Sequence, residues 1–306
     1  MIRMNNHAYH IPVLLKECIT GLNIVPNGVY VDITFGGGGH SAAILEKLGP
    51  NGKLFAFDQD EDAHKNAFTD PRFTLIPQNF RYIKNYLRFH QVRQVDGILG
   101  DLGVSSHQFD SAERGFSIRF DSKLDMRMNR NVKLSAADVI NTYPEEKLAA
   151  LLKEYGEITN GKKAAFLICT ARAEKPIETT DELKEITKSC TSRFEEHKFY
   201  AKLFQAIRIE VNQEMESLKE CLNDSVNLLK PGARLVVISY HSLEDRLVKN
   251  LIRSGNTEGI EEKDVIYGSV KKVFKNLTGK PVTPTEEEIK QNTRARSAKL
   301  RIAEKI

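Results

Sequence analysis

The feature that most constrains the fold is an alternation of short apolar runs with helix-like segments through the first 105 residues. Repeated strand–helix units of this kind build a parallel sheet with helices packed on it. Four runs have the length and the β-branched or aromatic content of buried strands, and they cover residues 29–35, 53–57, 73–76 and 95–99. We therefore expect an α/β fold with a mostly parallel sheet.

The pattern changes in the middle of the chain. Residues 135–193 contain helical stretches but no convincing strand, and a strongly apolar run returns only at 234–240. A sheet that stops and resumes on either side of a helical block indicates an inserted domain. We expect a discontinuous sheet domain made of residues 1–105 and 205–306, with a connecting loop and an inserted helical domain over 106–204.

The composition excludes two broad classes of protein. Hydrophobic residues make up 41% of the 306 and charged residues 28%, as in folded globular proteins and unlike disordered ones. The apolar runs, such as residues 235–240, are far shorter than the ~20 residues that span a bilayer. Residues 1–10 lack the apolar stretch and cleavage site of a secretory signal. We therefore expect a cytoplasmic protein with no membrane partner.

The cysteines predict neither a disulfide framework nor a metal centre. Cys18, Cys169, Cys190 and Cys221 stand far apart in the sequence and include no Cys-x-x-Cys pair. We expect reduced, mostly buried thiols and no bound metal.

The net charge of +4 is unevenly distributed. Residues 271–306 hold ten Lys or Arg and four acidic residues, which leaves the rest of the chain slightly negative. A basic tail on a nearly neutral body is typical of a protein that binds a polyanion, because neutralised phosphates release counterions. A solubilising tail is the alternative, and the charge alone does not decide between them.

A glycine-rich loop follows the first expected strand. Four glycines occupy positions 36–39, ahead of a helix that we expect from about Ser41, as its cap, to Leu48. Asp58 ends the second strand about 20 residues later, where a carboxylate accepts hydrogen bonds from ribose hydroxyls. Loop and acid together indicate an adenosine-containing ligand. The position three after Gly39 is Ala42, so the dinucleotide spacing of glycines is missing, and we favour S-adenosylmethionine over a nicotinamide cofactor.

Two further polar residues follow the fourth strand. Asp101 comes directly after it, at the position that faces the reactive end of such a cofactor. It is a candidate for orienting an amine or accepting its proton, and the alternative is a carboxylate that caps the turn. Gln108 either hydrogen-bonds the cofactor or caps a loop.

Two later segments are candidates for substrate contacts. Arg114, Phe116 and Arg127 belong to a polar stretch with interspersed aromatic residues, which suits stacking on an unpaired base and binding its phosphates. A surface loop packed on the insertion is the alternative. The run His241-Ser-Leu-Glu-Asp245 predicts a capping box of Ser242 with Asp245, and His241 and Arg246 are candidates for facing the active site.

These segments, in this order, closely resemble the bacterial 16S ribosomal RNA cytosine-N4 methyltransferases. The match extends over nearly the whole chain. It comprises the segments 10–15, Gly38-Gly-His-Ser41, Asp58-Gln-Asp60, Asp101-Leu-Gly-Val-Ser-Ser106, Arg114-Gly-Phe-Ser117, Leu124-Asp-Met-Arg-Met128, Phe204-Gln-Ala-Ile-Arg208, 237–246 and 294–301. A single block of this kind can occur by chance in an unrelated protein, but the whole set in this order is specific to the family.

The resemblance implies a class I S-adenosylmethionine-dependent methyltransferase, which is Rossmann-like with a mostly parallel sheet, and an inserted all-helical domain. It implies a decoding-centre cytosine of 16S ribosomal RNA, within the small ribosomal subunit, as the substrate methylated on N4. By matching position, it assigns cofactor contacts to Gly38, Gly39, His40, Asp58, Phe80, Asp101 and Gln108.

The chain departs from the family pattern mainly in the insertion. Tyr155-Gly-Glu is followed by Ile-Thr-Asn160, Ala201-Lys-Leu203 replaces an Arg-containing run, and Lys123 replaces a common proline. Three other functions remain open from the sequence: methylation of a protein or small molecule, a non-catalytic RNA-binding assembly factor, and, least expected, an NAD-dependent oxidoreductase. The sequence leaves the oligomeric state open.

Overall fold

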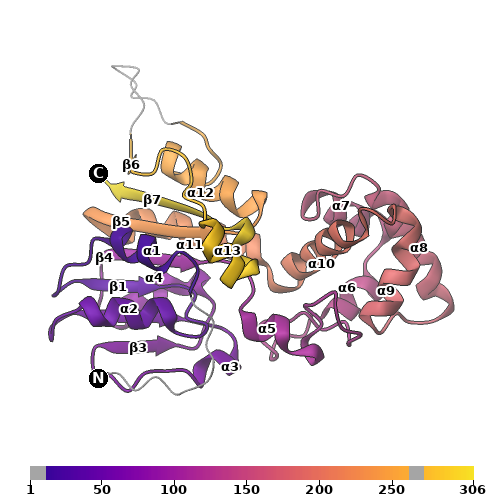
Figure 1. Cartoon of the computed structure of the whole chain (residues 1–306), viewed down its shortest axis with the longest axis horizontal. Coiled ribbons are helices and arrows are strands. Elements are labelled where there is room, and N and C mark those ends of the chain that lie inside the picture. Colours follow the sequence, from indigo (N-terminus) through magenta and orange to yellow (C-terminus); the bar gives the residue numbers. More distant parts are fainter. Residues whose placement is uncertain (1–11, 262–271) are drawn as a thin grey trace. The chain divides into compact units, whose positions relative to one another are not determined.

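The computed structural model describes residues 12–261 and 272–306, which belong to two compact units (Figure 1). The first, here called the sheet unit, is discontinuous and comprises Met1–Gly103 and Met215–Ile306. The second, the helical unit, is Val104–Glu214. Some residues of the sequence analysis lie outside the described residues. These are residues 1–10, where we expect no secretory signal, residues 10 and 11 of the 10–15 motif, and Lys271 of the basic segment.

The helical unit ends at Glu214, ten residues beyond the boundary at 204 that the sequence predicts. The cause is helix α10, which spans Glu196–Asn212 and so passes through the expected boundary. Its buried residues Ile207 and Val211 belong to the core of the helical unit. The motif 204–208 therefore belongs to the helical unit and not to the sheet unit.

The sheet unit is built on seven strands in the order β3-β2-β1-β4-β5-β7-β6. The first five pair in parallel, and β7 runs antiparallel to both of its neighbours. The strands are β1 Val29–Asp32, β2 Lys53–Phe57, β3 Phe73–Ile76, β4 Val95–Asp101, β5 Leu229–Ser239, β6 Phe274–Asn276 and β7 Lys299–Lys305. The register between β4 and β5 shifts near Pro231-Gly232, since Val95 pairs with Leu229 but Gly97 pairs with Arg234.

Successive residues of the central strands point to opposite sides of the sheet, and they are buried on both sides because helices cover both faces. One core cluster joins Leu22 of α1 and Ile44 of α2 to strand residues such as Leu99. The helices of the unit are α1 Leu15–Leu22, α2 Gly39–Lys47, α3 Glu61–His64, η1 Phe80–Tyr82, α4 Ile83–Phe89, α11 Glu214–Leu228, α12 Ser242–Ser254, α13 Glu286–Gln291 and η4 Thr293–Ser297.

The basic C-terminal segment is not a tail, which corrects the sequence-based expectation. Its last strand, β7, lies beside β5 within the sheet, as Figure 1 shows in orange and yellow. Leu300 is fully buried, and Arg301 is only 7% exposed because its guanidinium pairs with Asp245 of α12. The apolar alternation of this strand is easily missed among lysines and arginines.

The helical unit has its own hydrophobic core. Leu148 and Leu152 of α7 pack with Ala165 of α8 and Leu203 of α10 in one cluster. The expectation of helices without strands over 135–193 is confirmed for the described residues, where an isolated bridge of Lys123 with Thr179 is the nearest approach to a strand pair. The helices are α5 Ser106–Asp110, η2 Ala112–Arg114, α6 Ala136–Thr142, α7 Glu145–Glu154, α8 Gly161–Glu174, α9 Thr180–Thr187, η3 Lys188–Cys190 and α10.

The expected fold class, a Rossmann-like, mostly parallel α/β sheet with an inserted all-helical region, is thus confirmed. Among the described residues, no helix combines the length and the apolar character that crossing a membrane requires. The four cysteines are free, and three of them are buried.

Candidate active site

The glycine-rich loop is built on a buried acid at the end of β1. The carboxylate of Asp32 accepts hydrogen bonds from the Thr34 backbone N–H at 3.0 Å and from the Ser41 hydroxyl at 2.7 Å. Burial raises the pKa of Asp32, while these hydrogen bonds and His40 lower it. The expected role of Ser41 as a cap is wrong, because α2 begins at Gly39 and Ser41 lies within its first turn.

The glycines of this loop serve different purposes. Gly36 and Gly38 have positive φ values of 51° and 79°, a conformation that favours glycine. A Cβ atom on Gly38 would lie 2.8 Å from the Phe68 ring, and one on Gly39 would overlap Pro12. A Cβ on Gly36 would meet only the Thr34 carbonyl oxygen, 4.0 Å away. Two glycines therefore make room for the protein's own side chains, whereas Gly36 keeps the space above the loop free.

Asp58 ties the end of β2 to this loop. Its Oδ2 accepts the Gly36 backbone N–H at 2.8 Å and its Oδ1 accepts that of Asp60 at 2.9 Å. Burial raises the pKa of Asp58 to about 6 against the lowering effect of these two hydrogen bonds. Each carboxylate oxygen accepts more than one hydrogen bond, so Asp58 has capacity for two further donors such as vicinal hydroxyls.

Phe80 lies at the same edge of the sheet. It begins the short helix η1 after Asn79, whose side-chain amide donates to the Gln59 side chain at 3.1 Å. This hydrogen bond joins the loop after β3 to the loop after β2. Because β2 and β3 are parallel neighbours, Phe80 and Asp58 come from adjacent strand ends.

Asp101 ends β4 on the other side of the glycine-rich loop. Its carboxylate Oδ1 accepts the Tyr240 hydroxyl at 2.7 Å, and its Oδ2 lies 3.8 Å from Nδ1 of His40. The backbone N–H of Asp101 donates to the Thr34 hydroxyl at 2.6 Å. Burial raises the pKa of Asp101, and His40 and Tyr240 oppose that effect. Since the side chain keeps 23% of its surface exposed, a ligand has access to it.

Tyr240 is the member of this group that sequence reasoning missed. It follows β5 directly, and β5 is the parallel neighbour of β4. The rule that selected Asp58 and Asp101, a polar residue at the carboxyl end of a parallel strand, applies to it equally. From the sequence, only His241 and Arg246 are candidates at this strand end.

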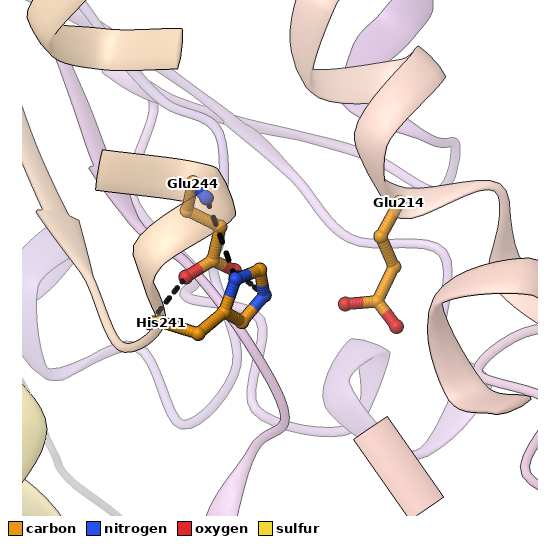
Figure 2. Close-up of side chains that lie close together, drawn as sticks. All are labelled: Glu214, His241 and Glu244. Carbon is orange, nitrogen blue, oxygen red and sulfur yellow. Dashed lines mark hydrogen bonds and ion pairs between the residues drawn. The ribbon is translucent and has the colours of Figure 1, made fainter. Parts of the chain in front are cut away.

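His241 and Glu244 together begin helix α12 (Figure 2). Nδ1 of His241 accepts the Glu244 backbone N–H at 3.4 Å, and the Glu244 carboxylate accepts the N–H groups of Tyr240 and His241. The expected capping box of Ser242 with Asp245 is therefore wrong by one position, and Asp245 pairs with Arg301 instead. Glu214, also drawn in Figure 2, is the last residue of the helical unit.

Arg246 is exposed on α12. Its proposed contact with substrate, like that of His241, stays a prediction.

In the helical unit, most side chains that we expect to contact nucleotides instead form contacts within the unit itself. Arg114 is 2% exposed and donates to the carbonyl oxygens of Arg127 and Met128 at 2.9 and 3.1 Å. Its guanidinium lies 5.7 Å from the ring centre of Phe116, which is 4% exposed in the core. Stacking of Phe116 on a base and phosphate binding by Arg114 do not fit this burial. Both residues are buried within the helical unit and do not belong to a surface loop, and their contact with substrate stays a prediction.

Arg127 is one-quarter exposed, but its guanidinium is also engaged within the unit. It forms a two-pronged pair with Asp125, at 2.9 and 2.8 Å, and donates to the carbonyl oxygens of Arg130 and Val132. Gln108 forms a capping box with Ser105 at the start of α5, which matches the loop-capping alternative.

The sheet unit thus gathers groups that suit a nucleoside bearing an amino acid moiety. Asp58 offers acceptors for ribose hydroxyls, Phe80 an aromatic face, and the start of α2 a set of backbone N–H groups. Asp101 offers an acceptor on the opposite side of the loop. This set of acceptors, backbone N–H groups and an aromatic ring fits S-adenosylmethionine.

Known proteins resemble the chain over almost its full length. The sequence profile described as the MraW methylase family matches residues 7–306. A protein of Flavobacterium johnsoniae named ribosomal RNA small subunit methyltransferase H is 59% identical over 298 residues, which cover 97% of this chain and 98% of that protein. Its namesake in Christiangramia forsetii is 58% identical with the same coverage. A solved rRNA methylase of Streptococcus thermophilus aligns over 97% of this chain and 99% of its own, with 13% identity and a TM-score of 0.43.

Proposed function

Because the chain belongs to the MraW methylase family, we propose that it methylates N4 of a decoding-centre cytosine in 16S ribosomal RNA, using S-adenosylmethionine. The observation that carries the proposal is the placement of Asp58 and Asp101 at strand ends on either side of the glycine-rich loop. The relatives' name supplies the class of RNA, and the resemblance in sequence supplies the cytosine and its N4 atom. The reaction would take place in the cytoplasm, on the small ribosomal subunit.

The residues that would hold the cofactor follow from the geometry and from the resemblance. When bound, S-adenosylmethionine supplies an activated methyl group on its sulfonium. Asp58 would accept the ribose hydroxyls, Phe80 would lie near the adenine, and the backbone at Gly38 and Gly39, with His40, would line the amino acid end. Gln108, which belongs to the helical unit, is assigned to the cofactor by the resemblance alone.

Asp101 would act on the substrate amine. The lone pair of a cytosine N4 is delocalised into the ring, so an acceptor that draws on an amine hydrogen raises its nucleophilicity. A partly buried carboxylate is suited to this, because its electrostatic effect is larger there than in water. The cytosine must be unpaired or turned out of its stack to reach the site.

The test is methyl transfer from labelled S-adenosylmethionine to small ribosomal subunits from cells that lack this protein, followed by nucleoside analysis of the RNA. We expect N4-methylcytidine at one decoding-centre site. Asp58→Ala should abolish incorporation at low cofactor concentration, because the variant loses the ribose acceptor.

The matched control is Asp224→Ala, which removes a surface carboxylate 3.7 Å from Lys84 in the same unit. Such pairs contribute at most about 1 kcal/mol, so this variant should methylate at the normal rate. Cofactor binding without incorporation into subunits or free RNA would contradict the proposal and direct attention to proteins and small molecules. A normal cellular role in the Asp58→Ala variant would instead indicate a non-catalytic assembly factor.

A further inference from the structure

Tyr240 is placed to control the carboxylate of Asp101. Its hydroxyl donates to Oδ1 of Asp101 at 2.7 Å, so one of the two carboxylate oxygens is held by the protein. The two residues lie 139 positions apart in the sequence and meet because β4 and β5 are parallel neighbours. This contact therefore depends on the sheet and not on local sequence.

The other oxygen, Oδ2, faces the ring of His40. The Nε2 atom of that ring lies 3.1 Å from the carbonyl oxygen of Val13, which only accepts hydrogen bonds. In the neutral ring the proton therefore lies on Nε2, and Nδ1, 3.8 Å from Oδ2, carries none. At 3.8 Å, Nδ1 lies beyond hydrogen-bond distance of Oδ2 whichever form the ring takes, so Oδ2 keeps its capacity for a donor from outside the protein.

Tyr240 is itself held firmly in place. Its backbone N–H donates to the Glu244 carboxylate at 2.8 Å, as part of the start of α12. Its ring packs against the core cluster of the sheet unit that includes Val236 and Ile238 of β5. Backbone and ring are thus fixed independently, and the hydroxyl keeps its direction toward Asp101.

We propose that Tyr240 is a positioning residue for methyl transfer, which fixes Asp101 through Oδ1 and turns Oδ2 toward the exocyclic amine of the substrate. This inference rests on the proposed function, because it names the group that prepares the acceptor of that reaction. The amine proton then passes to Oδ2 as the nitrogen–methyl bond forms and the sulfur–methyl bond breaks.

The inference has a consequence for pH dependence. A hydrogen bond donated by Tyr240 stabilises the ionised form of Asp101 and so lowers its pKa. His40 acts in the same direction, whereas Asp32 and Glu244 raise that pKa as like charges, and the Cys18 thiol also interacts with the carboxylate. Removal of the hydroxyl must therefore move the ionisation of Asp101 to higher pH.

The test compares Tyr240→Phe with Tyr30→Phe. Tyr30 is a buried tyrosine of the same unit, whose hydroxyl accepts the Val25 backbone N–H and does not touch Asp101. We expect the single-turnover rate of Tyr240→Phe on ribosomal subunits to fall about tenfold at pH 7, the loss typical of one hydrogen bond to a charged group. The acidic limb of its pH–rate profile should shift to higher pH, and that of Tyr30→Phe should not move.

A second measurement needs no methyl transfer. Carbon-13 NMR of aspartate carboxyls in the cofactor-free protein follows the titration of Asp101, whose signal is assigned by its absence in Asp101→Asn. Tyr240→Phe should raise the titration midpoint of that signal. Tyr30→Phe should leave it unchanged.

The two measurements separate the inference from the proposed function. If the wild-type protein fails to methylate RNA but the NMR midpoint shifts as expected, the proposed function is wrong and the positioning of Asp101 stands. An unchanged midpoint, or a Tyr240→Phe enzyme with the pH–rate profile of the wild type, would overturn the inference. A rate loss in Tyr240→Phe without a shifted profile would also overturn it, because that result indicates a merely structural role.

Discussion

The sheet unit and the helical unit use charged side chains in opposite ways. In the sheet unit, Asp58 and Asp101 stand at strand ends and keep oxygen atoms with capacity for further donors. In the helical unit, Arg114 and Arg127 both donate to backbone carbonyl groups of the same loop, and Arg127 also pairs with the carboxylate of Asp125. Strand ends meet side by side at one edge, whereas a long loop between helices must supply partners for its own buried carbonyl groups. A polar motif is therefore evidence of a contact with ligand only when the fold leaves its atoms available.

The most severe test of this comparison is Asp101→Asn in the sheet unit. Loss of a proton acceptor typically lowers a rate by 10²–10⁴-fold, and we expect a drop in the single-turnover rate of that order at saturating cofactor. Asp224→Asn, on the surface of the same unit, should retain the normal rate. An unchanged rate in Asp101→Asn would mean that the strand-end carboxylate does not act on the substrate.

Arg114→Met tests the helical side of the comparison. The substitution leaves the carbonyl groups of Arg127 and Met128 without this donor, and we expect the free energy of unfolding to fall by about 3 kcal/mol. Denaturant unfolding measures this change. RNA affinity of the folded fraction should stay at the wild-type value, and Arg114→Lys should be intermediate in stability. A stable variant that binds RNA poorly would restore the role as a nucleotide contact.

The pH dependence of Asp58 sharpens the comparison within the sheet unit. Because folding raises its pKa from 3.8 to about 6, the stabilisation that the protonated acid provides is present below pH 4 and is lost as pH rises through 6. The loss should amount to about 2–3 kcal/mol. Unfolding of the cofactor-free protein from pH 4 to 8 measures it, and Asp58→Asn should show a flatter profile. Cofactor affinity should follow the opposite trend and weaken as pH falls below 6, since the ionised carboxylate accepts both ribose hydroxyls.

His241→Ala has the smallest expected effect. As the cap of α12, His241 should contribute about 1 kcal/mol to stability, with little effect on the methylation rate. Thermal unfolding measures the change, and Ser242→Ala, at the position where the sequence had placed the cap, is the matched control with a smaller effect. A large loss of activity in His241→Ala at unchanged stability would identify His241 as a substrate contact.

Local patterns predicted the early strands well and the caps poorly. The expected strands 53–57 and 73–76 match β2 and β3 residue for residue, because each is a short, mainly apolar run in a parallel part of the sheet. The predicted caps Ser41 and Ser242 were wrong by three positions and by one position, since serine has the higher capping preference but the helices are capped at Gly38 and His241.

The sequence by itself determined the α/β class, the inserted helical block, and Asp58 and Asp101 as acids at strand ends. These follow from periodicity and from the rule that ligands bind beyond the carboxyl ends of parallel strands. Only the tertiary structure decided that β7 enters the sheet beside β5, that Arg114 is buried, and that Tyr240 reaches Asp101. Each of these depends on residues far apart in the chain. Short-range pattern carries no information about such pairings, because the free energy that selects them comes from packing and hydrogen bonds formed only in the complete fold.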